Sequence, residues 1–317
     1  MKLSKKIINR LKLESKLAAI RVTSAFKKFK PEDQFIIFSD PRGGSTWLAE
    51  MLQSIPESAM IWEPLNIRHV RQFGDLGFGW RQFIPENESW PEANLIFNLV
   101  FAGRIINEWT MLRTDFTKYY SARHLIIKFC RGNMLIPWLV FQYNFKYRPI
   151  YLVRHPFAVV LSQIKQGGWE STINKFIIPD TPYNDLYLYH QDYLYSLSTR
   201  EEILTAYWCL ANLIPLNHKK NNVDWITVYY ENLIMDPASE IGRIFSRWEL
   251  DLPEGIQNRF RKSSSTALDP GNLNDPFQQI SRWQRELKPD QIDRMKKVLG
   301  YFEVSQYAGE KEMPCFD

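Results

Sequence analysis

The sequence is poor in cysteine and has no apolar run long enough to cross a bilayer. Its three cysteines, Cys130, Cys209 and Cys315, show neither a CxxC spacing nor a Cys/His pattern. We therefore expect no disulfide framework and no bound metal, and a reducing compartment fits better. No apolar stretch approaches the roughly 20 residues of a membrane-spanning helix. The charged N-terminal segment lacks the apolar core of a secretory signal, and we expect a cytoplasmic protein.

Acidic residues are almost missing from the first 30 positions. Residues 1–30 contain ten Lys or Arg and one acid, Glu14. The rest of the chain keeps 30 of the 40 basic and 34 of the 35 acidic residues, so it is slightly acidic. A nucleic-acid-binding protein is expected to spread a basic face over its folded domain. Nucleic acid is therefore not an expected partner.

The basic segment has the spacing of an amphipathic helix over residues 4–29, and Pro31 ends it because proline cannot continue a helix. The apolar residues near one face of this helix are Ile8, Leu11, Ala18, Val22 and Phe26. Such a helix can lie on an anionic membrane surface. A solvated helix packed on the body, or one that pairs with another chain, is the alternative. We divide the chain into this helix, 1–30, and a single domain, 31–317.

Short apolar runs alternate with helical patterns along the rest of the chain. This alternation predicts an α/β fold, a P-loop-like three-layer α/β/α arrangement with a central parallel sheet. Strands are expected at 34–40, 125–129, 149–153 and 225–229, and helices at 45–54, 132–143, 156–165, 201–219 and 237–248. Segments 64–120 and 166–200 have weaker periodicity and many aromatics, and we expect them to build a substrate region. Residues 261–276 are expected to form a loop before a C-terminal helix from about 277.

The strongest local signal is the sequence DPRGGSTW, which lies between the first expected strand and the helix that follows it. Gly43 and Gly44 let the backbone turn tightly and approach an anion. Ser45 and Thr46 open the helix, whose free N–H groups and dipole favour a phosphate or sulfate. Arg42 adds a positive charge with a fork of donors. The segment therefore predicts an anion-binding loop.

This loop lacks the lysine of the nucleoside-triphosphate P-loop. That motif is G-x-x-x-x-G-K-[ST], and no Lys precedes the hydroxyl residues here. A P-loop-type nucleotide kinase is therefore an alternative rather than the first expectation. A non-catalytic, membrane-associated binding module that keeps the loop for structure is a further alternative.

A second signal lies at the end of the third expected buried strand, in the sequence RPIYLVRHP. Arg154 ends the apolar run, and Pro156 suits the first turn of the next helix. Ser162 follows two helical turns later. Open α/β sheets bind ligands beyond the carboxyl ends of their strands, so Arg154 is a candidate ligand-binding residue, and a structural ion pair is the alternative.

Together the two segments resemble the cofactor motifs of the PAPS-dependent sulfotransferase family, where PAPS is 3'-phosphoadenosine 5'-phosphosulfate. The first resembles its 5'-phosphosulfate loop, and the second its 3'-phosphate motif. Two departures are His155, where Asp is commoner, and Gly43, where Ser is common. Three further segments agree: WEPL at 62–65 resembles the E-P-L segment of carbohydrate-type members, YENL at 230–233 a later strand segment, and Trp283 with Leu287 a C-terminal W-x-x-x-L segment. The resemblance covers roughly residues 34–303.

The resemblance implies a set of donor-binding residues, with PAPS as donor and the bisphosphate PAP as product. The 5'-phosphosulfate is expected on Arg42, Gly43, Gly44, Ser45 and Thr46, and the 3'-phosphate on Arg154 and Ser162. Adenine is expected beside Trp47 and Tyr230, although Trp47 also suits a place in the core. Arg261 and Lys262 are weaker candidates for the 3'-phosphate and equally suit a solvated loop.

The acceptor hydroxyl requires a base, and the resemblance places Glu63 of the E-P-L segment in that role. A carboxylate works well as a base when its pKa is raised toward neutrality, and we expect burial near Trp62 to raise it. A structural salt bridge is the alternative for Glu63. His69 and Lys128 are expected on the substrate side, with Lys128 near the sulfuryl group.

The acceptor itself is expected to be a hydroxyl-bearing carbohydrate or glycolipid. The E-P-L segment points there, and Trp80, Trp90, Trp109 and Trp169 could stack on sugar faces. Small alcohols, phenols and tyrosine-bearing peptides stay open as alternatives. Peripheral membrane contact through residues 1–30 would suit a lipid-linked acceptor.

Overall fold

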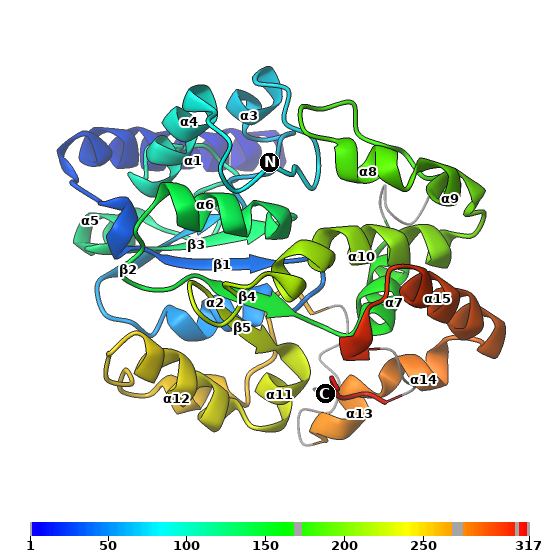
Figure 1. The fold of residues 1–317 in the computed structure, drawn as a ribbon. Helices are drawn as coiled ribbons and strands as arrows, with labels where there is room; N and C mark the ends of the chain where they lie inside the picture. Colours follow the sequence, from blue (N-terminus) through cyan, green and yellow to red (C-terminus); the bar gives the residue numbers. More distant parts are fainter. Residues whose placement is uncertain (1, 168–172, 268–274, 308–310, 316–317) are drawn as a thin grey trace.

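The computed structural model describes residues 2–167, 173–267, 275–307 and 311–315, with side chains from residue 5 onward. It shows a five-stranded parallel sheet with helices on both faces (Figure 1). The strands are β1 (Phe35–Ser39), β2 (Ser58–Trp62), β3 (His124–Cys130), β4 (Ile150–Val153) and β5 (Ile226–Tyr229). They lie in the order β2-β3-β1-β4-β5, and every neighbouring pair is parallel. The predicted three-layer α/β/α fold with a central parallel sheet is confirmed.

Helices are present near all five ranges expected in the body, 45–54, 132–143, 156–165, 201–219 and 237–248, whereas the helices within 64–120 and 166–200 were not foreseen. The first half of the chain has α1 (Lys2–Phe26), α2 (Ser45–Leu52), α3 (Arg71–Asp75), α4 (Pro91–Phe101), α5 (Phe116–Ser121), α6 (Ile136–Gln142) and α7 (Pro156–Gln166). The second half has α8 (Asp185–Tyr189), α9 (Gln191–Ser196), α10 (Arg200–Asn217), α11 (Tyr230–Met235), α12 (Pro237–Arg247), α13 (Pro276–Ile280), α14 (Arg282–Glu286) and α15 (Pro289–Tyr301).

Side chains alternate between two hydrophobic cores, one on each face of the sheet, as a period of two residues requires. In β1, Ile36 and Phe38 join the core with α4, α6, α7 and α10, whereas Phe35 and Ile37 join the core with α2, α11 and α12. Figure 1 shows α2, α11 and α12 on one side of the sheet and α4 and α6 on the other. Burial on both faces explains why the strands are continuous apolar runs.

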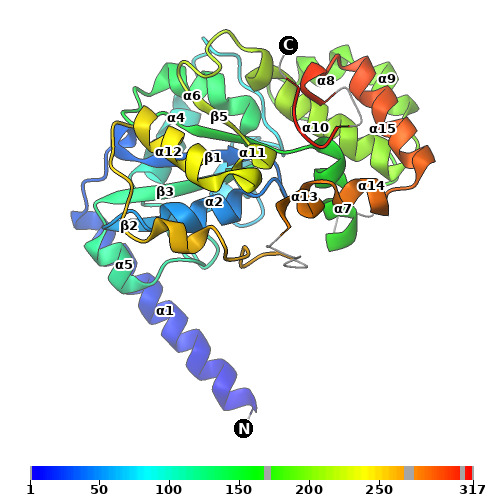
Figure 2. The same cartoon turned by 90° about the horizontal axis from the view of Figure 1, so that it is seen from below.

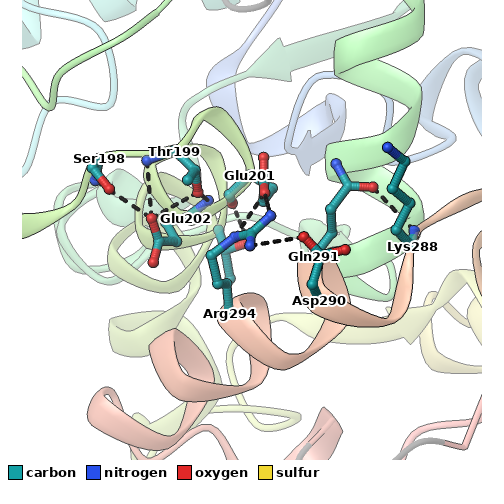
Figure 3. A network of polar contacts seen from close by, with 9 residues as sticks. Ser198, Thr199, Glu201, Glu202, Lys288, Asp290, Gln291 and Arg294 are labelled. Carbon is teal, nitrogen blue, oxygen red and sulfur yellow. Dashed lines mark hydrogen bonds and ion pairs between the residues drawn. The ribbon is translucent and has the colours of Figure 1, made fainter.

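The prediction of one continuous helix from about residue 277 is wrong. The structure has α13, α14 and α15 there, and Pro289 begins α15 after an extended Lys288. Figure 3 shows α15 held against α10, where Arg294 Nε donates to Glu201 at 3.0 Å. The start of α10 has a capping box, in which Thr199 and Glu202 satisfy each other's backbone N–H groups.

The face of the basic helix α1 that packs on the body is not the apolar face that the sequence spacing predicts. Leu17 and Ile20 are buried against the body, and Leu13 packs beside them. Ile8, Leu11, Val22 and Phe26 are 50–81% exposed. Figure 2 shows the N-terminal part of α1 extending away from the rest of the molecule. The division at residue 30 stays a prediction, because the second half of α1 shares the core of the body.

Candidate active site

The functional residues gather at one edge of the sheet, because parallel strands all end at the same edge. Arg42 follows β1, Glu63 follows β2, Arg154 follows β4 and Tyr230 follows β5. The chain leaves β1 toward β2 on one side and leaves β4 toward β5 on the other. A crevice at such a reversal of strand order is where open α/β sheets bind ligands.

A cavity of about 950 Å³ opens at this edge. Its lining includes most of the predicted site residues: Arg42, Gly44, Ser45, Thr46, Trp47, Glu63, His69, Lys128, Arg154, Ser162 and Tyr230. Eight Lys or Arg side chains line it, against two Glu. Such an excess of cations in a concave site attracts a polyanion.

A buried polar network holds the predicted anion-binding loop, residues 40–44, in place. Asp40 is 4% exposed, and its Oδ2 accepts a hydrogen bond from Asn212 at 2.6 Å. Gln163 on α7 donates to the carbonyl of Pro41 at 3.0 Å. The Gly43 N–H turns back to the Asp40 carbonyl at 2.9 Å. These bonds fix the loop against α7 and α10 before any ligand is present.

Two positions in the loop have left-handed backbone, which fixes its path. Gly44 has φ +95°, and a Cβ there would lie 2.4 Å from the ring of Tyr230. Only glycine therefore fits between the loop and that ring. Arg42 has φ +71° although it carries a side chain. A non-glycine residue in this region costs about 1–3 kcal/mol, and such costs cluster at functional sites.

Arg42, Arg154 and Ser162 form one connected group. Arg42 Nε donates to Ser162 Oγ at 3.0 Å, and Arg154 Nη1 donates to the Arg42 carbonyl at 3.1 Å. The pKa of Arg42 is lowered by burial and by the nearby charge of Arg154. Two guanidinium groups held this close repel each other, and a bound dianion relieves that repulsion. The structure thus brings the two predicted phosphate-binding segments together.

Tyr230 and Trp47 form the floor of the cavity beneath these cations. The Tyr230 ring lies 4.4 Å from the Arg154 guanidinium carbon, and its hydroxyl accepts from Gln279 Nε2 at 3.0 Å. Trp47 is 6% exposed and its Nε1 donates to the Lys262 carbonyl at 2.9 Å. Trp47 therefore serves the core and still lines the cavity.

Glu63 and Lys128 form a buried ion pair at the other end of the cavity. Lys128 Nζ lies 2.6 Å from Glu63 Oε1, and the Cys130 thiol donates to the same oxygen at 3.2 Å. Glu63 has φ +41°, which aims its side chain from the end of β2 toward β3. Burial raises the pKa of the Cys130 thiol to about 12, so it stays a donor.

The expectation that surrounding apolar residues raise the pKa of Glu63 is wrong. Burial does raise it, but the charge and hydrogen bond of Lys128, with the Cys130 hydrogen bond, more than offset that influence. The pKa of Glu63 consequently lies below its usual value of 4.5. The carboxylate is ionised at neutral pH and is ready to accept a proton, although it is a weaker base than we expected.

One side of the cavity is lined by residues from the segment 64–120, and the substrate role expected for this segment stays a prediction. His69 stacks on Trp109 with ring centroids 4.3 Å apart, and Trp109 Nε1 donates to the Glu63 carbonyl at 3.2 Å. Trp80 also lines the cavity and lies 4.7 Å from the Arg131 guanidinium. Trp90 does not line it and instead stacks on Phe78. Trp169 and residues 269–271 lie outside the described residues.

Arg261 and Lys262 do not meet Arg154 and Ser162. Their side chains line a second cavity of about 570 Å³, together with Arg259 and Glu50. Gly43 also misses the lining, since its space is taken by Ser39 Oγ, which lies 2.2 Å from where a Cβ would be. These three predicted binding residues therefore lie apart from the connected residues Arg42, Arg154 and Ser162.

Sequence reasoning missed several residues of the site, namely Arg113, Cys130, Arg131 and Arg68. Cys130 and Arg131 lie at the end of β3, and that position was the available signal, because every strand of a parallel sheet ends at the ligand edge. Arg68 and Arg113 come from a segment of weak periodicity, and no sequence signal places them.

The YENL and W-x-x-x-L segments line the cavity through Tyr230 and Trp283, and they also support the start of α7. The buried carboxylate of Glu231 accepts from the His155 N–H at 2.8 Å and from the Tyr307 hydroxyl at 2.9 Å. Trp283 stacks on His155 at 4.6 Å. Burial lowers the pKa of His155 to about 3, so this ring is neutral. His155, at the departure from the family pattern, acts as the cap of α7.

Two absences bear on the kind of site. Across the parts of the chain that the structure describes, no three His, Cys, Asp or Glu side chains gather as metal ligands would. In the same residues, no helix has the length and apolarity of a membrane span.

Comparison with known proteins gives similar structures and no sequence match. No protein-family model matches the chain, and no curated protein matches it. The sulfotransferase domain of the Synechococcus PCC 7002 olefin synthase is 20% identical, covering 86% of this chain and 98% of its own, with a TM-score of 0.43. The sulfotransferase domain of the curacin biosynthetic pathway is 15% identical, covering 85% and 98%, with a TM-score of 0.46.

A third similar structure is a mouse sulfotransferase complexed with PAP. It is 16% identical, covers 90% of this chain and 88% of its own, and has a TM-score of 0.42. At these identities and TM-scores, the three similarities do not establish what this chain does. The conclusion on function therefore depends on the site itself.

Proposed function

We propose that the chain is a PAPS-dependent sulfotransferase that transfers a sulfuryl group to an acceptor hydroxyl. The observation that carries this proposal is the connected group of Arg42, Arg154 and Ser162 at the crevice between β1 and β4. Two anion-binding segments that converge on one cavity suit a nucleotide with phosphates at both ends. A kinase acting on ATP needs no second anion-binding segment, and its P-loop motif contains the lysine that is missing here.

The charge of the cavity suits the donor. Arg42 and the N–H groups at the start of α2 would hold the 5'-phosphosulfate, and Arg154 with Ser162 the 3'-phosphate. The ring of Tyr230, which leaves no room for a side chain at Gly44, would support the adenine. When bound, PAPS supplies the sulfuryl group, whose bond to the 5'-phosphate breaks as the acceptor oxygen bonds to sulfur.

Glu63 and Lys128 have complementary roles in this proposal. Glu63, ionised at neutral pH, accepts the proton that the acceptor hydroxyl loses. Lys128, which is 2% exposed, places a fixed positive charge beside it, where negative charge develops on the sulfuryl oxygens. His69 and Trp109 form a stacked wall that positions the acceptor.

Titration calorimetry with PAP and with ATP tests the donor assignment. Binding of PAP without added metal, at least tenfold tighter than ATP, is expected, because Arg154 and Ser162 are assigned to a 3'-phosphate that ATP lacks. Equal affinity for the two nucleotides, or a requirement for Mg²⁺, would favour the kinase and reject the sulfotransferase.

The acceptor in this proposal is a carbohydrate or glycolipid. Its support is that Trp80 and Trp109 line the acceptor side, where aromatic faces can pack on sugar rings. A screen with labelled PAPS, using glycosides, phenols and small alcohols side by side, tests it. Transfer to phenols or alcohols in preference to every glycoside would replace the carbohydrate acceptor by the alternative.

We further propose that α1 contacts anionic membrane surfaces. Leu11, Ala18 and Val22 are spaced for one helical face, and that face is exposed, whereas the opposite face packs on the body. Arg10, Lys12 and Arg21 lie next to these apolar residues and are exposed as well. An apolar stripe bordered by cations matches the acyl and headgroup layers of an anionic membrane.

Sedimentation with vesicles of phosphatidylcholine alone, and of phosphatidylcholine with 30% phosphatidylserine, tests this contact. We expect binding to the second only, and a loss of more than about tenfold for the triple variant Leu11→Ser, Val22→Ser, Phe26→Ser. Leu95→Ser with Val223→Ser, two exposed apolar residues elsewhere, is the matched control. Undiminished binding of the triple variant, or self-association through this face without vesicle binding, rejects the proposal.

A further inference from the structure

The second cavity adjoins the first, and nothing in the proposed donor binding uses it. It has a volume of about 570 Å³ and is bordered by α2, by the end of β2 and by the loop at 259–265. Trp62, Arg113 and Ser263 line both cavities. The two spaces therefore share a wall next to Glu63, on the acceptor side of the site.

The lining of this second cavity is basic. Four cations, Arg113, Arg259, Arg261 and Lys262, stand against one acid, Glu50. Arg259 is paired with Glu50 at 3.2 Å. The pairing leaves Arg113, Arg261 and Lys262 as cations in excess, so the cavity is suited to an anion.

Arg113 has a buried guanidinium N–H without an acceptor among the described residues. The residue is partly buried, and the N–H is that of its Nε. The guanidinium carbon of Arg113 lies 5.1 Å from the centroid of the Trp62 ring, which is next to it in the cavity wall. A buried guanidinium N–H without an acceptor is costly, so an anion beside Arg113 would be favourable.

The backbone around Arg113 is fixed in place, although it lies in an irregular segment. The Thr114 hydroxyl accepts from the Met60 N–H at 2.9 Å and donates to the Met60 carbonyl at 2.6 Å. The Trp62 N–H donates to the Thr110 carbonyl at 2.9 Å. These bonds hold the segment along the free edge of β2, so Arg113 is presented to the cavity by a rigid support.

The Trp62 ring connects this cation to the reaction centre. Lys128 Nζ lies 3.7 Å from the centroid of the same ring that Arg113 contacts, and Lys128 pairs with Glu63. The Trp62 ring is therefore what lies between a group bound at Arg113 and the pair of Lys128 with Glu63, the proposed proton acceptor. A single small acceptor can reach both.

We propose that the second cavity binds an anionic group of the acceptor, a carboxylate, sulfate or phosphate, through Arg113 with Arg261 and Lys262. This inference rests on the proposed sulfotransferase function and narrows its acceptor to a hydroxyl-bearing molecule that already carries a negative charge. In the carbohydrate case, the acceptor is an acidic or already sulfated sugar. Arg261 and Lys262 thereby take a role apart from the 3'-phosphate.

Two matched pairs of probes test the proposal by calorimetry on the PAP-loaded protein. The first pair is p-nitrophenyl β-D-glucuronide and p-nitrophenyl β-D-glucoside, and the second is a 6-sulfated and an unsulfated p-nitrophenyl N-acetylglucosaminide. We expect the anionic member to bind about 10–100-fold more tightly, the range of a charge-assisted hydrogen bond. Equal binding within both pairs, or no binding by either anionic member, overturns the proposal.

Variants of Arg113 separate a charge effect from a structural one. Arg113→Gln should lose the preference for the anionic member and leave the neutral member unchanged, and Arg113→Lys should restore part of it. Arg148→Gln, an exposed arginine before β4 at the opposite edge of the sheet, is the matched control. An Arg113→Gln protein that keeps the full preference overturns the assignment.

Binding of PAP alone keeps the two proposals distinguishable. Failure of the wild-type protein to bind PAP rejects the sulfotransferase. Normal binding of PAP without any preference for anionic probes rejects the acceptor inference and leaves the sulfotransferase standing.

Discussion

Lys128 lies on β3, Glu63 directly follows the neighbouring parallel strand β2, and their side chains meet at 2.6 Å where β2 ends. Trp62, the last residue of β2, is in register with Lys128, so the residue that follows it reaches the ammonium group directly. The pair is buried, and a charge that loses its partner there is costly. Several properties of the protein should therefore depend on both members together.

Glu63→Gln should lower kcat by about 10²–10⁴, the usual contribution of a positioned general base. The amide keeps the size of the side chain but cannot accept the proton of the acceptor. The measurement is initial rates with labelled PAPS, with PAP affinity as the control, and that affinity should change little. A variant with the wild-type kcat excludes Glu63 as the base.

Replacing Lys128 should move the acid limb of the pH profile upward. In the wild type, the pKa of Glu63 lies below its usual 4.5, so activity that needs its ionised form is lost only as pH falls through that lower value. In Lys128→Met, burial is no longer offset by the ammonium and raises the pKa of Glu63. The remaining activity should then fall at a higher pH than in the wild type.

The same change should alter the pH dependence of stability. A carboxyl group with a lowered folded-state pKa adds stability above its unfolded pKa, and this is lost as pH falls through the folded value. Lys128→Met reverses the direction for Glu63, so the variant should lose stability on going from acid to neutral pH relative to the wild type. Urea unfolding at pH 4 and pH 7 measures it, and an unchanged difference contradicts the ion pair.

Arg154→Ala should weaken PAP binding by about 10–100-fold, since charge-assisted hydrogen bonds contribute about 1.5–3 kcal/mol. The substitution also removes the bond from Arg154 to the Arg42 carbonyl, which holds the anion loop. Calorimetry with PAP measures the loss, with Arg148→Ala as the control at an exposed position. Affinity equal to that of the control would place the 3'-phosphate elsewhere.

Gly44→Ala should destabilise the protein by about 1–3 kcal/mol, because a left-handed residue gains a Cβ that meets the Tyr230 ring. Gly242→Ala is the matched control. Gly242 lies within α12, and a Cβ there would find no atom within 4 Å. The control should stabilise by up to about 1 kcal/mol. Urea unfolding of both variants decides, and equal effects would contradict the close packing at Gly44.

The sequence could predict the parts of this molecule that local patterns determine. The strand–loop–helix units around Arg42 and Arg154 follow from apolar runs, glycine and proline, and their meeting at one sheet edge follows from parallel pairing. The strand Ser58–Trp62 was not among the strands expected from periodicity.

Other features depend on contacts between distant segments and leave no local mark. Both faces of α1 carry apolar residues, so periodicity could not tell that Leu17 and Ile20 pack inward while Leu11 and Val22 face solvent. The pKa of Glu63 depends on Lys128 and Cys130, which lie 65 and 67 positions further along the chain. The position of Arg113 is fixed by the hydrogen bonds between Thr114 and β2, and no sequence motif predicts these bonds.

The arrangement of the sheet edge separates the two substrates along the chain. The residues proposed to bind the donor follow β1, β4 and β5, whereas those proposed to bind the acceptor lie between the end of β2 and the end of β3, with Arg261 and Lys262 as the exceptions. A change in one group of loops leaves the backbone of the other group untouched. The proposed acceptor specificity can therefore diversify, in evolution or in the laboratory, largely by exchange of the segment between β2 and β3 while the proposed donor-binding segments stay the same.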